Sequence, residues 1–214
     1  MQIENNSTLL FTGDSITDAD RQRPVGEGVS GQLGAGFVNL VGAYLTAFHP
    51  QKRIRVLNTG VGGDTTRELS ARWDADVLAL KPDYVCCMIG VNDCWRHFGR
   101  FWNDELLVSV EEYKNTLCRL IDRTLPQVKG MVLMTPYYFE ASPQEPMRAS
   151  MDAYRAAMKD VAHRKNLPCF DTQEPIDRAL KNAHPCMLSA DHVHPNTGGQ
   201  MILMRTFLEG MNLW

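Results

Sequence analysis

The sequence predicts an α/β fold in which about five parallel strands lie between two layers of helices, in one domain over residues 1–214. Short apolar runs of strand length alternate along the chain with stretches whose apolar residues recur at helical spacing. Residues 84–89 are almost continuously apolar, which is typical of a central parallel strand covered on both faces. A length of 214 residues suits one such domain and is short for two.

The predicted strands are short apolar runs that end at turn-forming residues. They cover residues 9–11, 54–58, 83–90, 131–135 and 169–171. The glycine-rich stretch at 26–36, between the first strand and the first long helix, is predicted to have no regular structure.

The predicted helices are recognised by apolar residues three or four positions apart and by helix-capping or helix-breaking residues at their ends. Pro50 ends the first, a capping-box pattern from Thr65 to Glu68 opens the second, and Pro82 closes it. Two further helices are expected near 147–164 and 175–181. The residues that mark the other four are Val38, Val41, Leu45 and Phe48; Leu69, Trp73, Val77 and Leu80; Leu106, Val110, Tyr113, Leu117 and Leu120; and Met201, Ile202, Arg205 and Leu208.

Composition and charge exclude several classes of partner. A net charge of −3 provides no basic surface for nucleic acid, so we expect no nucleic-acid partner. No run approaches the roughly 18 apolar residues that span a bilayer. The start of the chain lacks the basic and apolar parts of a signal peptide. We therefore expect a cytoplasmic protein with no membrane partner.

The six cysteines do not form a metal-binding pattern. They are scattered and include no Cys-x-x-Cys pair, so a zinc site of the usual spacing is unsupported. We expect them to pack as small apolar side chains, and we expect no metal and no other cofactor.

Ser15, His194 and Asp191 are the candidate catalytic residues. Ser15 follows the first predicted strand directly, while Asp191 precedes His194 by three residues in a loop near the end of the chain. Serine, histidine and aspartate form hydrolytic triads that are recognised by geometry and not by chain order. The alternative for Ser15 is a helix N-cap, because Ser15 to Asp18 also fits a capping box.

Three groups are candidates for stabilising an oxyanion: the backbone N–H groups of Ser15 and Gly63 and the side-chain amide of Asn92. Each follows a predicted strand, and the carboxyl ends of parallel strands meet at one edge of a sheet. Gly63 alternatively serves only turn geometry, and Asn92 an Asx turn. A metal site formed by Asp191, His194 and His192 is a third alternative.

An aromatic-rich connection follows Asn92. We expect Trp95 to shape a substrate pocket, and Phe101 and Trp102 to meet a partner subunit, because flat aromatic faces suit both sugar rings and interfaces. The alternative is that these side chains only cap the end of the sheet.

Four sequence blocks resemble those of the SGNH (GDSL-type) hydrolases. They are Gly-Asp-Ser at 13–15, Asn58-x-Gly60-x-x-Gly63-Asp64-Thr65, Gly90-Val91-Asn92-Asp93 and Asp191-x-x-His194-Pro195. The resemblance implies a flavodoxin-like three-layer α/β/α sandwich, a triad of Ser15, His194 and Asp191, and oxyanion donors from Ser15, Gly63 and Asn92. There is no Gly-x-Ser-x-Gly elbow of the ordinary α/β-hydrolase type.

A narrower resemblance is to the intracellular acetylxylan esterases of this superfamily. It is carried by the stretches at 18–21, 71–73, 92–96 and 134–138. It implies removal of acetyl groups from xylan fragments and assembly into a homo-oligomer. The chain has Ala190 where those relatives often have an aromatic residue. The alternatives are a thioesterase or lysophospholipase with the same triad, or a noncatalytic phosphate- or nucleotide-binding domain.

Overall fold

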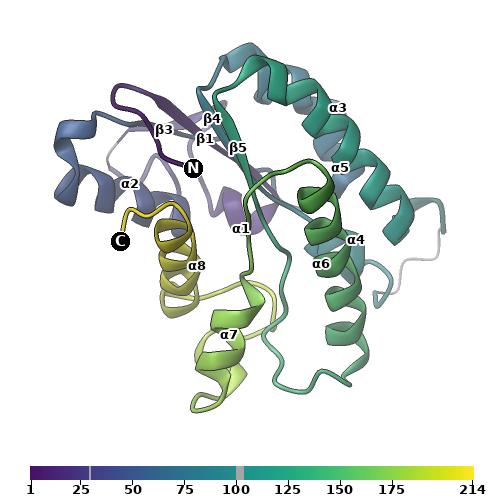
Figure 1. Ribbon diagram of the computed structural model, residues 1–214. Coiled ribbons are helices and arrows are strands. Elements are labelled where there is room, and N and C mark those ends of the chain that lie inside the picture. The colour runs from purple at the N-terminus through teal and green to yellow at the C-terminus, as the bar shows by residue number, and fades with distance from the viewer. Residues whose placement is uncertain (29, 100–103) are drawn as a thin grey trace.

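The computed structural model describes residues 1–28, 30–99 and 104–214, and these form a six-stranded sheet between two layers of helices (Figure 1). The strands are β1 (Thr8–Gly13), β2 (Gly26–Glu27), β3 (Arg55–Asn58), β4 (Tyr84–Met88), β5 (Gly130–Met134) and β6 (Cys169–Phe170). They lie in the order β2-β3-β1-β4-β5-β6, and all pairs from β3 to β6 are parallel. Without β2 this is the flavodoxin-like order, so the predicted fold is confirmed.

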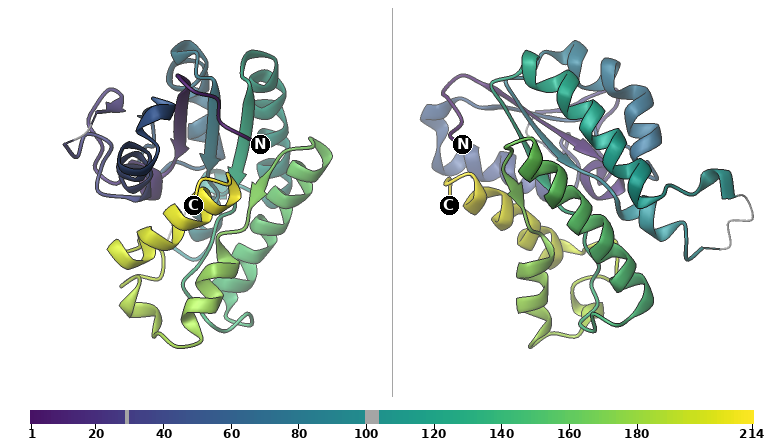
Figure 2. Two further views of the ribbon diagram at one scale, coloured as in Figure 1. Left: turned by 60° about the vertical axis from the view of Figure 1, so that its left-hand side comes forward. Right: turned by 45° about the vertical axis from the view of Figure 1, so that its right-hand side comes forward.

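Helices cover both faces of the sheet (Figure 2). The longer ones are α2 (Phe37–Phe48), α3 (Thr66–Asp76), α5 (Val110–Thr124), α6 (Pro146–Arg164), α7 (Gln173–Leu180) and α8 (Thr197–Gly210). On one face α2 packs against α8 and α8 against α7, and on the other α5 packs against α3 and α6. Two short helices, α1 (Ser15–Asp18) and α4 (Val91–Trp95), follow β1 and β4. The 3-10 helices are η1 (Pro50–Lys52), η2 (Leu78–Leu80), η3 (Asp104–Leu106), η4 (Leu125–Gln127) and η5 (Pro185–Met187).

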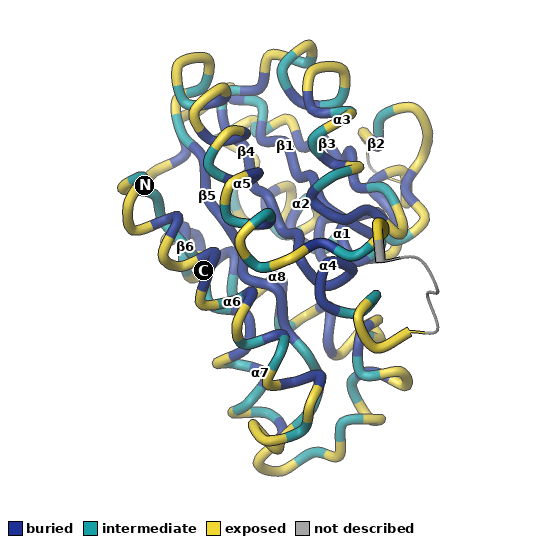
Figure 3. Tube along the Cα trace, turned by 90° about the vertical axis from the view of Figure 1, so that its right-hand side faces the viewer, coloured by how far each residue is buried: buried dark blue, intermediate teal, exposed yellow. Residues whose placement is uncertain are grey.

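The core lies along the central strands, which Figure 3 shows as the most continuously buried part of the chain. Every residue of β4 is buried, as the apolar run predicted. Leu10, Val85 and Leu133 are fully buried on three adjacent strands. Burying a side chain of this kind stabilises the fold by about 1.5–3 kcal/mol. The well-packed strands therefore hold the loops at the edge of the sheet in fixed positions.

The stretch at 26–36 is not wholly irregular, which corrects the prediction. Gly26 and Glu27 form β2, which pairs antiparallel with Asn58 and Leu57 at the edge of the sheet. Arg55 on β3 donates a 2.5 Å hydrogen bond from Nε to the Glu27 carboxylate. A two-residue edge strand held by an ion pair leaves no alternating apolar pattern from which it could be predicted.

Several residues placed on helices by their spacing lie elsewhere. Leu106 belongs to η3 and is exposed, because α5 begins only at Val110 after the N-cap Ser109. Leu80 lies in η2, beyond the end of α3. Phe48 is on α2 as predicted, but its side chain faces outward and is 67% exposed. Spacing alone therefore misjudged the ends of these apolar faces.

The prediction that the six cysteines pack as small apolar side chains is confirmed for only some of them. All six cysteines are free; Cys86, Cys87 and Cys94 are buried, while Cys186 is exposed. The exposed thiol contradicts the expectation that every cysteine serves packing. Within the described ranges, no helix is both long and apolar enough to cross a membrane.

Candidate active site

Ser15 is the first residue of α1, directly after β1. Asp14 is the N-cap of this helix, and its Oδ1 accepts a 3.0 Å hydrogen bond from the Ile16 N–H. The alternative in which Ser15 is the cap is therefore wrong, and its hydroxyl is free for another partner. Gly13 is required before it, because a Cβ there would lie 2.0 Å from the Met88 carbonyl oxygen on β4.

A chain of two hydrogen bonds joins the three predicted triad residues. The Ser15 Oγ lies 2.9 Å from His194 Nε2, although the two residues are 179 positions apart. His194 Nδ1 lies 2.6 Å from Asp191 Oδ2. With the ring proton on Nδ1, the imidazole donates to Asp191 and Nε2 accepts from the serine hydroxyl. This arrangement has the geometry of a Ser-His-Asp triad.

Asp191 is an ionised carboxylate held by its own loop. Its Oδ1 accepts hydrogen bonds from the backbone N–H of Val193 at 3.0 Å and of His194 at 2.7 Å. Partial burial alone would raise the pKa of Asp191. The hydrogen bonds from the His194 ring and from the two backbone N–H groups outweigh it and lower the pKa to about 2. The carboxylate therefore keeps its charge beside the imidazole at every working pH.

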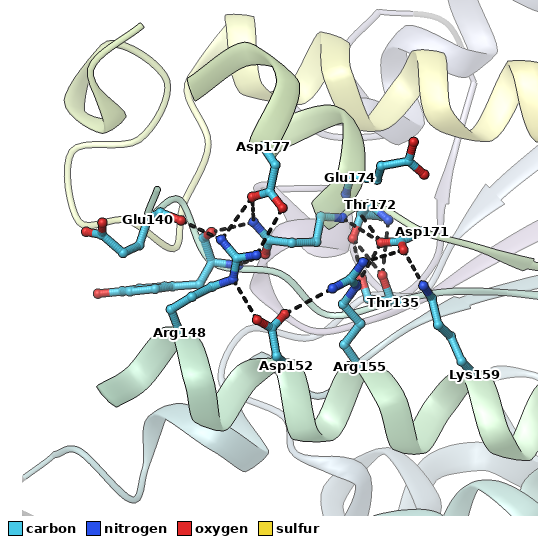
Figure 4. A network of polar contacts seen from close by, with 12 residues as sticks. Thr135, Glu140, Arg148, Asp152, Arg155, Lys159, Asp171, Thr172, Glu174 and Asp177 are labelled. Atoms are coloured by element: carbon cyan, nitrogen blue, oxygen red, sulfur yellow. Dashed lines mark hydrogen bonds and ion pairs between the residues drawn. The ribbon is translucent and has the colours of Figure 1, made fainter. Parts of the chain in front are cut away.

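The loop that carries Asp191 and His194 is supported by the segment after β5. Phe139 donates its N–H to the His192 carbonyl at 2.9 Å, and Tyr137 donates its hydroxyl to the Val193 carbonyl at 3.3 Å. The buried Arg148 of α6 in turn donates to the Glu140 carbonyl at 2.5 Å. Figure 4 shows Arg148 of α6 bonded to Asp177 of α7 and to Glu140, while Asp152 joins it to Arg155. Hydrogen bonds from the segment after β5 therefore fix the backbone of the loop that carries the base.

The turn that carries Gly63 lies beside Ser15, and the Asn92 side chain is bonded to the residue that follows Gly63. A Cβ built on Gly62 would lie 3.8 Å from the Ser15 Cβ, so the Gly62–Gly63 turn runs next to the serine. Gly63 has a φ of +86°, a conformation that favours glycine, so the turn itself requires this residue. Asn92 is buried in the first turn of α4 and donates its side-chain amide to the Asp64 carbonyl at 2.9 Å.

Asn92 lies within α4, and its amide has one further hydrogen to donate. The Cys94 N–H, which an Asx turn would bond to the Asn92 side-chain oxygen, donates to the Gly90 carbonyl at 3.1 Å, so the Asx-turn alternative is wrong. A side-chain amide carries two hydrogens, and the Asp64 carbonyl takes one of them. The second can serve the oxyanion.

The N-terminus of α3 lies directly after Gly63 and Asp64. Thr65 and Glu68 form the predicted capping box. The buried Asp93 also accepts hydrogen bonds from the Thr66 N–H at 3.1 and 3.2 Å. Burial raises the pKa of Asp93 to about 6, although hydrogen bonds from Thr66 oppose this rise. These contacts fix the start of α3 and, directly before it, the turn that carries Gly63.

Asp14 is a buried acid next to the proposed nucleophile. Its complete burial raises the pKa to about 7, with the Ile16 N–H lowering it and the nearby carboxylates of Asp93 and Asp64 raising it further. At neutral pH the Asp14 side chain is therefore partly protonated.

Trp95 lies next to the candidate triad. Its ring packs edge-on against the His194 imidazole, with 5.7 Å between centroids. Phe98, farther along the same connection, is exposed. Phe101 and Trp102, predicted at a subunit interface, lie outside the described residues.

The predicted metal alternative has no support in the described part of the chain, where no group of three or more His, Cys, Asp or Glu side chains is placed to hold a metal ion. His192 faces away from Asp191 toward Tyr138, at 5.6 Å between ring centroids, and toward the Glu140 carboxylate, 3.8 Å from Nδ1.

Sequence reasoning missed the side chains that support the donor loops. Arg72 on α3 binds Asp64 and two backbone carbonyl groups, and Arg96 donates to the Gly63 carbonyl at 2.7 Å. The signals in the sequence were the spacing of Arg72 and Asp76, which is common for surface ion pairs of helices, and the place of Arg72 and Arg96 in two stretches that resemble acetylxylan esterases.

Comparison with known proteins identifies the family. The model of the GDSL-like Lipase/Acylhydrolase family matches residues 11–202. An acetylxylan esterase from Geobacillus stearothermophilus is 47% identical over 208 residues, which cover 97% of this chain and 95% of that protein. A crystal structure of a catalytic mutant of an acetylxylan esterase from the same organism matches with a TM-score of 0.98 and 45% identity, covering 100% of this chain and 98% of that chain.

A further solved structure is an alpha/beta hydrolase enzyme from the metagenome of Lake Arreo, Spain. It matches with a TM-score of 0.96 and 43% identity, covering 99% of this chain and 97% of that chain. The resemblance to the SGNH (GDSL-type) hydrolases is confirmed. The chain belongs to the GDSL-like Lipase/Acylhydrolase family.

Proposed function

We propose that this protein is a serine esterase that removes acetyl groups from carbohydrate, with xylan fragments or xylo-oligosaccharides as its substrates. The observation that carries the proposal is the hydrogen-bonded chain from the Ser15 Oγ through His194 to Asp191. A noncatalytic phosphate- or nucleotide-binding domain has no use for this arrangement.

The first half of the reaction forms an acetyl-enzyme. The Ser15 Oγ attacks the acetyl carbonyl carbon while His194 Nε2 accepts the hydroxyl proton. The negative charge that develops on the carbonyl oxygen is stabilised by the N–H groups of Ser15 and Gly63 and by the free hydrogen of the Asn92 amide. When the C–O bond to the sugar breaks, His194 gives its proton to the departing sugar oxygen.

The second half releases acetate. Water attacks the acetyl-enzyme carbonyl, His194 accepts one water proton, and the bond to the Ser15 Oγ then breaks with the proton returned to that oxygen. Asp191 holds the imidazole in the correct tautomer and stabilises its charged form in both halves. No metal or other cofactor takes part in this proposal.

Two features support a sugar substrate. The relatives that match nearly the whole chain include acetylxylan esterases. In addition, Trp95 packs beside His194, and a flat indole face suits the C–H face of a sugar ring.

The experiment is an activity panel with the wild-type protein and Ser15→Ala as the matched control. Acetylated xylo-oligosaccharides should be deacetylated, and esters of long acyl chains should be poor substrates. A preference for long-chain esters would favour the lysophospholipase or thioesterase alternative. Activity that survives in Ser15→Ala would contradict the serine mechanism.

We further propose that the protein is a cytoplasmic homo-oligomer. All six cysteines are free, which suits a reducing compartment. Trp214 is 56% exposed and stacks on Tyr44, which also contacts the exposed Phe48, so apolar aromatic surface is available for a second copy. Light scattering should give a mass larger than one chain; a monomeric mass at micromolar concentration would contradict assembly.

A further inference from the structure

One guanidinium that is largely shielded from solvent contacts the loops that carry the proposed oxyanion donors. The Arg72 network consists of Arg72, the carboxylates of Asp64 and Asp76, and the backbone carbonyl groups of Gly13 and Thr59. Arg72 Nε donates to Asp64 Oδ2 at 2.6 Å, and Nη1 donates to the Thr59 carbonyl at 2.6 Å and to Asp76 Oδ2 at 3.0 Å. Its Nη2 donates to the Gly13 carbonyl at 2.9 Å.

Two of these contacts, those with Gly13 and Asp64, lie next to a proposed oxyanion donor. Gly13 precedes Ser15 by two residues, at the end of β1. Asp64 directly follows Gly63, and its backbone carbonyl accepts the Asn92 amide at 2.9 Å. Arg72 therefore links the positions of all three donors, which come from three separate loops.

The chemistry of the side chain suits this role. The Arg72 side chain is 16% exposed and that of Asp64 9%, so solvent screens the pair weakly. Burial raises the pKa of Asp64, whereas the hydrogen bond and charge of Arg72 lower it and so favour the ionised carboxylate. A planar guanidinium donates several hydrogen bonds in a fixed geometry, which the single ammonium of lysine cannot reproduce.

We propose that Arg72 is a positioning residue of the oxyanion hole, which holds the loops of Ser15, Gly63 and Asn92 in the geometry that stabilises the transition state. This inference rests on the proposed function. Arg72 acts through these donors and does not itself touch the substrate. Its contribution belongs to the chemical step more than to substrate binding, because the donors bind the oxyanion most strongly in the transition state.

The test compares Arg72→Lys with a matched control, Arg155→Lys. Arg155 also pairs with two carboxylates, Asp152 and Asp171, and its side chain is 22% exposed, but it lies on α6 away from the donor loops. With an aryl acetate, Arg72→Lys should lower kcat by about 10²-fold, the loss expected for catalytic groups displaced by about 1 Å, with KM changed less than about threefold. Arg155→Lys should keep a normal kcat.

A double-mutant cycle shows whether Arg72 acts through the oxyanion donors. Asn92→Ala alone should cost about 10²- to 10³-fold in kcat, and the same change in the Arg72→Lys background should cost at least about tenfold less, since the two side chains act on one site. If the double mutant loses as much kcat as the product of the two single losses, the side chains act independently and the inference is overturned. A normal kcat in Arg72→Lys, or an equal loss in Arg155→Lys, would also overturn it.

A second variant keeps the test decisive if Arg72→Lys does not fold. Asp64→Asn removes the same ion pair and leaves the guanidinium in place, and it should lower kcat by about tenfold at unchanged KM. A normal kcat in a folded Asp64→Asn protein would contradict the role of the pair. Failure of the proposed function is separate, because it appears as activity that persists in Ser15→Ala with Arg72 intact.

Discussion

The two sides of the candidate active site are built in different ways. The Ser15 side consists of short helix starts and a tight turn at the ends of β1, β3 and β4, and the buried Asp93 and the largely shielded Arg72 connect them. The His194 side is a surface loop before α8, and the side chains of His194 and Asp191 are 46% and 45% exposed. The first is fixed by the sheet, whereas the second is held by hydrogen bonds within its loop and from the segment after β5.

This difference matches what the two sides must do. Oxyanion donors are effective when they already point at the developing charge and need no rearrangement. The base must take up and release a proton and give it to a departing group, which requires an accessible ring in a defined tautomer. Asp191 fixes the tautomer because its carboxylate accepts a hydrogen bond from the ring. Two backbone N–H groups donate to the same carboxylate and hold it in place.

Removal of the base should have the largest effect. His194→Ala should lower kcat by about 10⁴-fold or more, as for other triad deletions. Since the His194 ring is half exposed, added imidazole should enter the vacated position and restore part of the rate. The control is Asn92→Ala, which imidazole should not rescue. Equal rescue of both variants would contradict the distinction between the two sides.

Loss of one oxyanion donor should have a smaller but still large effect. Asn92→Ala should lower kcat by about 10²- to 10³-fold with little change in KM, because the donor acts mainly in the transition state. Steady-state kinetics and a melting curve decide it. A normal kcat with a collapsed melting temperature would mean that the amide serves only its contact with the Asp64 carbonyl.

Trp95 should affect substrate choice more than chemistry. If its ring contacts the sugar, Trp95→Ala should lower kcat/KM on acetylated xylo-oligosaccharide several-fold more than on 4-nitrophenyl acetate, a few kcal/mol at most for one apolar contact. Trp95→Phe is the matched variant and should lose less. Equal losses on both substrates would place Trp95 in support of His194 instead of in the sugar pocket.

The last prediction concerns the stability of the fold instead of the reaction rate, through the buried acid Asp14. Its pKa is 3.8 in the unfolded chain and about 7 in the fold, so both states are protonated at low pH. As pH rises between these values, the unfolded chain loses its proton first. Asp14 therefore lowers stability progressively over this interval and by a constant amount above it.

Asp14→Asn keeps an oxygen acceptor for the Ile16 N–H and removes this pH dependence. As pH rises from 4 to 8, the melting temperature of the variant should rise relative to that of the wild type by roughly 10 °C, because the full pKa difference corresponds to about 4 kcal/mol and 1 kcal/mol shifts Tm by about 2–4 °C at this chain length. A parallel dependence in both proteins would contradict the raised pKa of Asp14.

Much of this arrangement could be predicted from the sequence, for physical reasons. Apolar runs placed the parallel strands, and the rule that their carboxyl ends share one edge brought Ser15, Gly63 and Asn92 together. Contacts to backbone carbonyl groups, such as those of Arg72 with Gly13 and Thr59, could not be predicted because every residue carries the same acceptor. Asp14 was missed as the helix cap because Ser15 fits the same pattern.

The central claim is that Ser15 is the nucleophile of a Ser-His-Asp triad. The most direct measurement is mass spectrometry after treatment with a fluorophosphonate, with wild-type protein and Ser15→Ala in parallel. The account predicts a single phosphonyl group on the peptide that contains Ser15, loss of esterase activity in proportion to labelling, and neither label nor turnover in Ser15→Ala. Labelling of a different serine, or turnover that persists in Ser15→Ala, would contradict it.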